Sequence, residues 1–209
     1  ADVIRLKKIE EMVEVYYNSG QFRNTMEHAE KEFSGAFAMY SSLADYYEKN
    51  NLFCVSHSRI ARYEILFHFL KEHIETYSDG FEDCRRPASR SAEDSQQSAA
   101  ESEESRMAEY TAWLTLDLYL RDNVRNRPSF LPENKVSSDE AAVFYKTEEE
   151  ERRYLKNYAG YDRRQMRKMT HLERLFGRML LFDYRERDPL SGDAKVYKIE
   201  ERTVGNEFS

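Results

Sequence analysis

The amino-acid sequence predicts a mainly α fold of the α+β class, in which a helical bundle is followed by a small C-terminal antiparallel β-meander. Three observations predict this. Apolar residues recur every three or four positions through most of the chain, as in helices that bury one face. Only 7 Gly and 4 Pro interrupt the 209 residues. After Gly160 the pattern changes to the alternation of apolar and polar residues that is typical of strands.

Residues 1–77 are expected to form an N-terminal bundle of four helices. Their apolar stripes predict helices at 3–17, 21–33 and 37–50, and a fourth that starts at Ser56 or Ser58 and runs to about residue 74. The first three helices end at residues that favour turns, Gly20 and Gly35 among them. Because the connections are short, consecutive helices are expected to be neighbours.

Residues 78–106 have a different composition. The segment contains seven serines and many acidic residues but no Leu, Ile or Val. Such a composition buries too little apolar surface to offset the entropy cost of ordering. We therefore expect an acidic, serine-rich, disordered linker, with 80–102 either mobile or a fraying extension of the flanking helices. Cys84 within it is expected to be an incidental exposed thiol.

Residues 107–168 are expected to supply the helices that complete the bundle. A strongly apolar helix runs from Met107 to about Asn123, and a connector with two prolines follows. Ser138 opens a further helix that is expected to continue to Gly160. Within that helix the acidic run 148–151 is expected to face water, with Arg152 and Arg153 as local partners.

Residues 169–203 are expected to form the small antiparallel β-meander. Alternating or aromatic-rich stretches predict strands near 169–175, 178–184 and 195–200. The segment 188–193 contains Pro, Ser, Gly and Asp, which favour a turn. The charges that alternate between Asp183 and Pro189 fit either cross-strand ion pairs or a polar rim beside a substrate cavity.

Composition excludes several classes of protein. The formal net charge of −7 argues against a surface that binds nucleic acid throughout, although a local basic patch is compatible with it. Two cysteines are too few for a disulfide framework. The sequence has no apolar run of transmembrane length and no signal-peptide pattern, so no membrane partner and a cytoplasmic location are expected. Helical periodicity begins at once after Ala1, which suggests a piece of a longer protein.

Aromatic residues make up 13% of the chain, and 15 of them are Tyr. Tyr supplies apolar area with a polar hydroxyl, so it serves both cores and interfaces. Tyr16, Tyr40, Tyr47 and Tyr63 share stripes with Leu, Phe and Met and are expected in the core. The remaining aromatic residues concentrate between 145 and 184, so a docking surface is expected in the C-terminal third.

Motifs for catalysis, cofactors or metals do not emerge from the sequence. His68 and His73 lie five residues apart, which is the wrong spacing for one helical metal site. Cys54 and His57 form one pair with no second pair at a useful distance. The sequence also lacks a serine or cysteine nucleophile signature and a glycine-rich phosphate loop. We predict no catalytic, cofactor-binding or metal-ligating residue in this chain.

A basic cluster is the strongest local charge anomaly. Arginines and a lysine gather between 163 and 178, and aromatic side chains lie among them. Such surfaces can stack on and neutralise single-stranded nucleic acid. The favoured alternative is a solvated segment that pairs with glutamates or docks an acidic domain. The candidate interaction surface comprises Tyr161, Arg163, Arg164, Arg167, Lys168, Arg174 and Arg178.

Three stretches of the sequence together resemble a known family. They are Tyr16-Tyr17-Asn18-Ser19-Gly20-Gln21-Phe22, Asp117-Leu118-Tyr119-Leu120-Arg121-Asp122-Asn123 with Arg127-Pro128, and Leu180-Leu181-Phe182-Asp183-Tyr184. They resemble the uncharacterised C-terminal domain of cobalamin-binding (B12-binding) radical SAM proteins. The resemblance spans nearly the whole chain except the serine-rich segment.

The resemblance implies a non-catalytic accessory domain that packs on the radical SAM domain or gates its active site. S-adenosylmethionine, an iron–sulfur cluster and cobalamin are implied for the parent protein only, and the upstream domains of the same chain are the implied partners. The cysteine loop that would hold the cluster is missing here, so the chain itself is not expected to be an enzyme. Two alternatives remain open: a helical module that binds RNA or a nucleotide, and a protein–protein interaction or dimerisation module.

Overall fold

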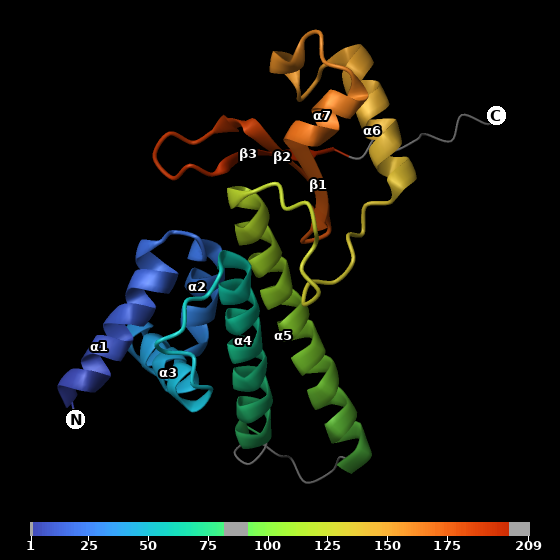
Figure 1. Cartoon of the computed structure of the whole chain (residues 1–209). Helices are drawn as coiled ribbons and strands as arrows, with labels where there is room; N and C mark the ends of the chain where they lie inside the picture. Colours follow the sequence, from blue (N-terminus) through green and yellow to red (C-terminus); the bar gives the residue numbers. More distant parts are fainter. Residues whose placement is uncertain (1, 82–91, 201–209) are drawn as a thin grey trace. The chain divides into compact units, whose positions relative to one another are not determined.

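The computed structural model describes residues 2–81 and 92–200, and side-chain burial for 2–76 and 103–200 (Figure 1). Within these ranges the predicted fold class is confirmed: the chain is mainly helical, with a three-stranded antiparallel sheet. The helices are α1 (Asp2–Val13), a π-helix (Glu14–Asn18), α2 (Arg23–Ala29), a 3₁₀ turn (Glu30–Glu32), α3 (Ala36–Lys49), α4 (Arg59–Phe81), α5 (Ala92–Arg121), α6 (Ser138–Glu151), a 3₁₀ turn (Lys156–Tyr158) and α7 (Arg163–Met169). The strands are β1 (Thr170–Leu175), β2 (Arg178–Arg187) and β3 (Ala194–Ile199).

The chain divides into two compact units. The first comprises residues 1–118 and 128–131, and the second comprises 119–127 and 132–209. This division differs from the expected one, in which 107–168 completes the bundle, because α6 and α7 belong with the sheet. The reason is their shared core: Tyr145, Tyr158 and Met166 from the helical part pack with Leu172 and Leu181 from the strands.

The first unit has an aromatic core in which the hydroxyls of Tyr16, Tyr47 and Tyr63 find partners. The hydroxyls of Tyr16 and Tyr47 lie 2.7 Å apart, and the Tyr63 hydroxyl donates to the carbonyl of Gln21 at 2.8 Å. The Phe22 ring lies between those of Tyr16 and Tyr63, with centroid distances of 4.8 and 4.5 Å. Burial of these rings stabilises the fold. The hydrogen bonds offset the free-energy cost of removing the hydroxyls from water.

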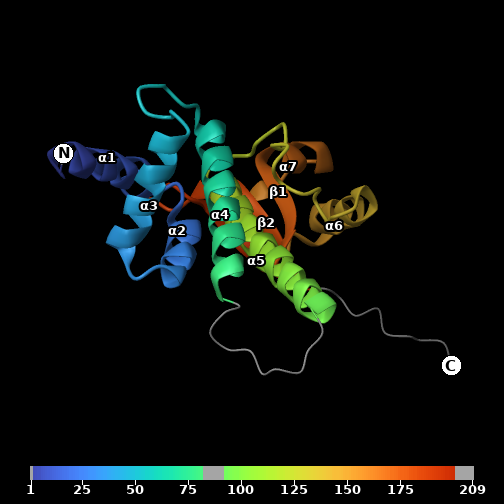
Figure 2. The ribbon, with the colours of Figure 1, turned by 90° about the horizontal axis from the view of Figure 1, so that it is seen from below.

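Helices α4 and α5 extend into the segment predicted to be a serine-rich linker. Helix α4 ends at Phe81 and α5 begins at Ala92, so 78–81 and 92–106 are helical. In the first unit the two helices are neighbours at one end and diverge toward residues 81 and 92 (Figures 1 and 2). Residues 82–91, with Cys84 among them, lie outside the described residues. In the described part of the chain, no helix is long and apolar enough to cross a membrane.

The predicted meander is present in the second unit as a sheet with strand order β1-β2-β3. Leu172 of β1 pairs with Leu181 of β2, which in turn pairs with Tyr197 of β3. The turn between β1 and β2 consists of Phe176 and Gly177, both with positive φ (51° and 71°). Positive φ at both central residues is the geometry that matches the twist of a two-residue hairpin.

The buried carboxylate of Asp117 on α5 caps the N-terminus of α2. Its oxygens accept hydrogen bonds from the backbone N–H groups of Asn24 and Thr25 at 3.1 and 2.8 Å. They also accept from the Asn24 amide and the Thr25 hydroxyl, both at 2.7 Å. The residue before α2, Phe22, provides no side-chain cap. A residue 92 positions further along the chain therefore satisfies the free N–H groups of this helix.

We expect Asp117→Asn to destabilise the protein by about 1–3 kcal/mol, because the amide provides one acceptor oxygen where two oxygens now serve four donors. Urea unfolding followed by circular dichroism would measure the change. The exposed Glu64→Gln on α4 is the matched control and should unfold like the unaltered protein. Equal stability of the two variants would contradict the capping role.

His73 on α4 links stability to pH. Its ring stacks on that of Phe33 at 4.2 Å, and burial lowers its pKa below the ordinary 6.5, although Glu32 raises it and Arg106 lowers it further. The unfolded state therefore binds more protons than the folded state just below pH 6.5. This histidine accordingly contributes a loss of stability as the pH falls through that range.

We expect His73→Phe, which keeps a ring for stacking, to lose less stability than the unaltered protein between pH 7 and pH 5. Thermal unfolding across this range would measure the slope. The exposed His68→Gln should retain the original slope, since that side chain lies in solvent and does not share the stacked environment of His73. If His73→Phe keeps the original slope as well, His73 does not cause the pH dependence.

Candidate arginine pocket

The short helix α7 presents the predicted arginines to solvent. Asp162 starts the helix with a capping box, in which its carboxylate accepts from the Gln165 N–H at 2.8 Å and the Gln165 side chain accepts from the Asp162 N–H at 2.9 Å. Met166 is buried in the core of the second unit. With that residue fixed inward, Arg163, Arg164 and Arg167 are exposed.

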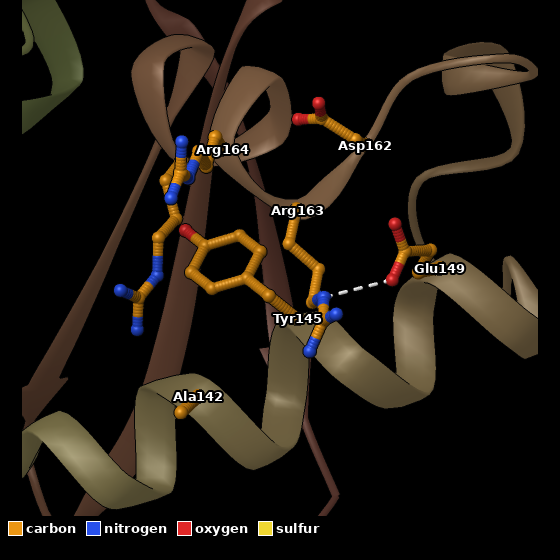
Figure 3. A pocket seen from close by; sticks show the side chains of 7 residues that line it. Ala142, Tyr145, Glu149, Asp162, Arg163 and Arg164 are labelled. Atoms are coloured by element: carbon orange, nitrogen blue, oxygen red, sulfur yellow. Dashed lines mark ion pairs between the residues drawn. The ribbon is translucent and has the colours of Figure 1, made fainter.

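Helix α6 provides the facing wall. It begins with a capping box between Ser137 and Glu140. Ala142, Tyr145 and Glu149 follow at intervals of three and four residues, which places them on one side of the helix. These side chains and the arginines of α7 enclose a pocket of about 470 Å³ (Figure 3). Its lining residues are Ala142, Tyr145, Glu149, Asp162, Arg163, Arg164 and Arg167.

Tyr145 is the fixed element of the pocket. Its hydroxyl lies 2.7 Å from that of Thr170, and the Thr170 hydroxyl donates to the carbonyl of Met166 at 2.8 Å. Because Thr170 has one proton to give, Tyr145 is the donor between the two hydroxyls. Burial raises the pKa of Tyr145 to about 12, against smaller opposite effects of Thr170 and Arg167, so the phenol is neutral at physiological pH.

The guanidinium groups give the pocket a positive balance. Arg163 Nε lies 2.8 Å from Glu149 Oε2 (Figure 3), and the Arg167 guanidinium lies over the Tyr145 ring at 5.2 Å. Arg164 has no ion pair within the described residues. Three cations thus face two carboxylates, one of which, Asp162, already serves as the helix cap. Planar guanidinium groups in this arrangement can bind carboxylate or phosphate oxygens.

The other four residues of the predicted surface do not line this pocket. Arg174 pairs with Glu140 at 2.9 Å. Lys168 and Arg178 are exposed and do not line the pocket. The Tyr161 ring is covered by the guanidinium of Arg185 at 5.0 Å. Three of the seven residues therefore share the pocket, and the wider candidate surface stays a prediction.

The candidate surface predicted from the sequence did not include three residues that shape this region. Tyr145 and Glu149 line the pocket, and Arg185 occupies the faces of both Tyr158 and Tyr161, at 5.4 and 5.0 Å. The spacing of 142, 145 and 149 on one helical face was a signal that could have identified the first two. Arg185 stood out only as one of the alternating charges of 183–189, and its ring contacts were not predictable because they join a strand to a loop 24 or more residues away.

The acidic run 148–151 was expected to face water, but its first residue does not. Glu148 is buried, and its Oε2 accepts from the backbone N–H groups of Tyr154 and Leu155 at 3.0 and 2.8 Å. Arg152 adopts a left-handed conformation with φ of 52° and ends α6 at Glu151, nine residues before the expected Gly160. The Glu148 carboxylate thus provides an acceptor for the backbone N–H groups of the turn that follows this early end of the helix.

Residues of the second and third resembling stretches take part in buried networks of the second unit. Arg127 forms two hydrogen bonds with the Glu173 carboxylate, at 2.8 and 3.2 Å. His171 Nε2 lies 2.9 Å from the same carboxylate, and the His171 ring stacks on Tyr119 at 3.8 Å. The Tyr184 hydroxyl donates to the Tyr119 carbonyl at 2.8 Å. Buried groups with these partners support the fold.

Asp183, from the third stretch, is also buried, and it accepts from the Tyr158 hydroxyl and from the backbone N–H of Arg185. Within residues 2–81 and 92–200, no group of three or more His, Cys, Asp or Glu side chains could hold a metal ion.

The fold and the pocket define a helical α+β domain with an arginine-lined surface pocket. Residues 1–188 match the family described as "Protein of unknown function (DUF4080)", and the chain belongs to that family. The matched range ends before β3. Searches of the curated proteins and of the solved structures found no match.

We expect Glu148→Ala to lower stability by about 2 kcal/mol, because two N–H groups of the turn after α6 lose their acceptor. Differential scanning calorimetry would measure the change. Glu150→Ala, two residues away and exposed, should remain within about 0.5 kcal/mol of the unaltered protein. A small effect at both positions would mean that water can replace the Glu148 carboxylate.

Proposed function

We propose that this chain is a non-catalytic accessory domain that docks an acidic segment of a catalytic partner domain in its arginine pocket. The observation that carries the proposal is the convergence of Arg163, Arg164 and Arg167 on one pocket with a neutral tyrosine at its base. Arginine can bind carboxylates in pairs of parallel hydrogen bonds, which makes it suited to fix one domain against another.

The sequence resemblance supports a cobalamin-binding radical SAM enzyme as the partner, encoded upstream in the same chain, with this domain packing on its active site or gating it. In this proposal S-adenosylmethionine, the iron–sulfur cluster and cobalamin belong to the parent enzyme. The residues of this chain do not suit the cluster, because three thiolates are needed and Cys54 and Cys84 are the two cysteines. The cytoplasmic location stays a prediction.

Contacts of the aromatic side chains favour a protein partner over nucleic acid. A base would need an open ring face beside the cations. A guanidinium lies over one face of each of these rings, that of Arg167 over Tyr145 and that of Arg185 over Tyr158 and Tyr161. Binding of RNA or a nucleotide is therefore the second candidate function.

We expect the double substitution Arg164→Glu and Arg167→Glu to release the domain in the full-length native protein, because like charges then face each other across the contact. Small-angle scattering should show a larger radius of gyration, and limited proteolysis between the domains should be faster. The control Lys135→Glu with Lys198→Glu makes the same change in net charge at exposed positions and should leave both measurements unchanged.

An unchanged radius and proteolysis rate in the arginine variant would overturn the docking proposal. Salt-sensitive binding of single-stranded RNA by the unaltered protein, lost in the same variant, would replace it with the nucleic-acid reading. Intact mass and the absorption spectrum of the native protein would test the parent enzyme. A mature chain without upstream domains or a bound corrinoid would contradict that part.

A further inference from the structure

A second pocket, of about 410 Å³, lies within the first unit and is independent of the proposed docking function. Its wall comes from the π-helix, α2, the following 3₁₀ turn and α3. The lining combines aromatic rings with charged groups, namely Tyr16, Tyr17, Tyr40, Arg23, Glu27 and Glu30. A pocket of this size accommodates a small organic molecule or a long side chain.

A wide helical turn places two adjacent tyrosines differently. At the end of the π-helix the Ser19 N–H donates to the Glu14 carbonyl, five residues earlier, at 3.2 Å. Tyr16 is fully buried, whereas Tyr17 remains 68% exposed. Single π-turns of this kind are common at functional sites. Here the turn contributes one fixed ring and one accessible ring to the pocket.

Tyr40 on α3 adds a polar group that the fold does not use. The residue is only 6% exposed, lines the pocket, and its hydroxyl has no hydrogen-bond partner among the described residues. Burial above all, and then the charges of Glu30 and Tyr17, raise its pKa to about 12. The hydroxyl is therefore neutral and free to accept a hydrogen bond from a bound group.

The charged groups of the pocket are also uncommitted. Glu27 and Glu30 lie three residues apart, so their side chains are neighbours on the helix surface. Neither carboxylate forms an ion pair within the described part of the chain, and Arg23 likewise pairs with neither of them. The formal balance at the pocket is negative, beside ring faces that attract cations.

We propose that this pocket binds an organic cation, a primary ammonium or guanidinium group carried on an apolar stem. The cation would donate hydrogen bonds to the carboxylates of Glu27 and Glu30 and to the hydroxyl oxygen of Tyr40. Its stem would lie against the rings of Tyr16 and Tyr17 and the buried Met26 and Met39. Arg23 opposes the cation by like charge.

Isothermal titration calorimetry with hexylammonium tests the proposal, with hexanoate as the anion of matched length. We expect hexylammonium to bind and hexanoate to give no heat. Glu27→Gln with Glu30→Gln should weaken binding by at least about tenfold, and Tyr40→Phe should weaken it by a smaller factor. Arg23→Ala should strengthen it, since a like charge is removed.

The matched control is Glu10→Gln with Glu11→Gln, two exposed glutamates of α1, which should leave the affinity unchanged. Two further probes separate the sources of the cation: capped lysine amide represents a protein side chain and 1,5-diaminopentane a free amine. Preference for either identifies the source. Equal binding of hexanoate, no heat with any amine, or unchanged affinity in the double glutamate variant would overturn the proposal.

Discussion

The carboxylate of Asp117 is buried in the first unit, where an ion without partners would be too costly to keep. Its four hydrogen bonds join the C-terminal part of α5 to the start of α2. The same solution recurs in the second unit, where Glu148, Glu173 and Asp183 are buried and accept from N–H, guanidinium or hydroxyl donors. Each carboxylate fixes the relative position of the segments it joins, because its directional hydrogen bonds are formed in one arrangement whereas apolar packing is not directional.

These buried acids also explain what the sequence could and could not predict. Helical spacing and alternation predicted the class, the first helices and the meander, because apolar periodicity reports which face is buried. The same periodicity does not predict which acidic side chains are buried. Glu148 stands in a run of four glutamates, and nothing local distinguishes it from Glu149, which lies at the pocket. That difference is set by the left-handed Arg152 and the turn beyond it.

The candidate pocket was predictable only in part. The arginines of α7 were visible as a charge anomaly, since clustered charge is a property of the sequence. The wall that faces them was not, because Tyr145 is brought to α7 by the shared core of the second unit. The contact between Arg185 and Tyr161 likewise depends on tertiary structure. It places a guanidinium over one face of a ring that the sequence alone left available for stacking.

The abundance of tyrosine is explained by where each ring is buried and by the partner of each hydroxyl. In the first unit Tyr16 and Tyr63 bury their rings and bond their hydroxyls internally, so they act as core residues. Tyr145 does the same at the base of the arginine pocket. Tyr40 differs from all three, because its ring is buried and its hydroxyl is left without an internal partner. A hydroxyl without an internal partner at the wall of a pocket is open to a bound group, and this indicates recognition better than the number of tyrosines does.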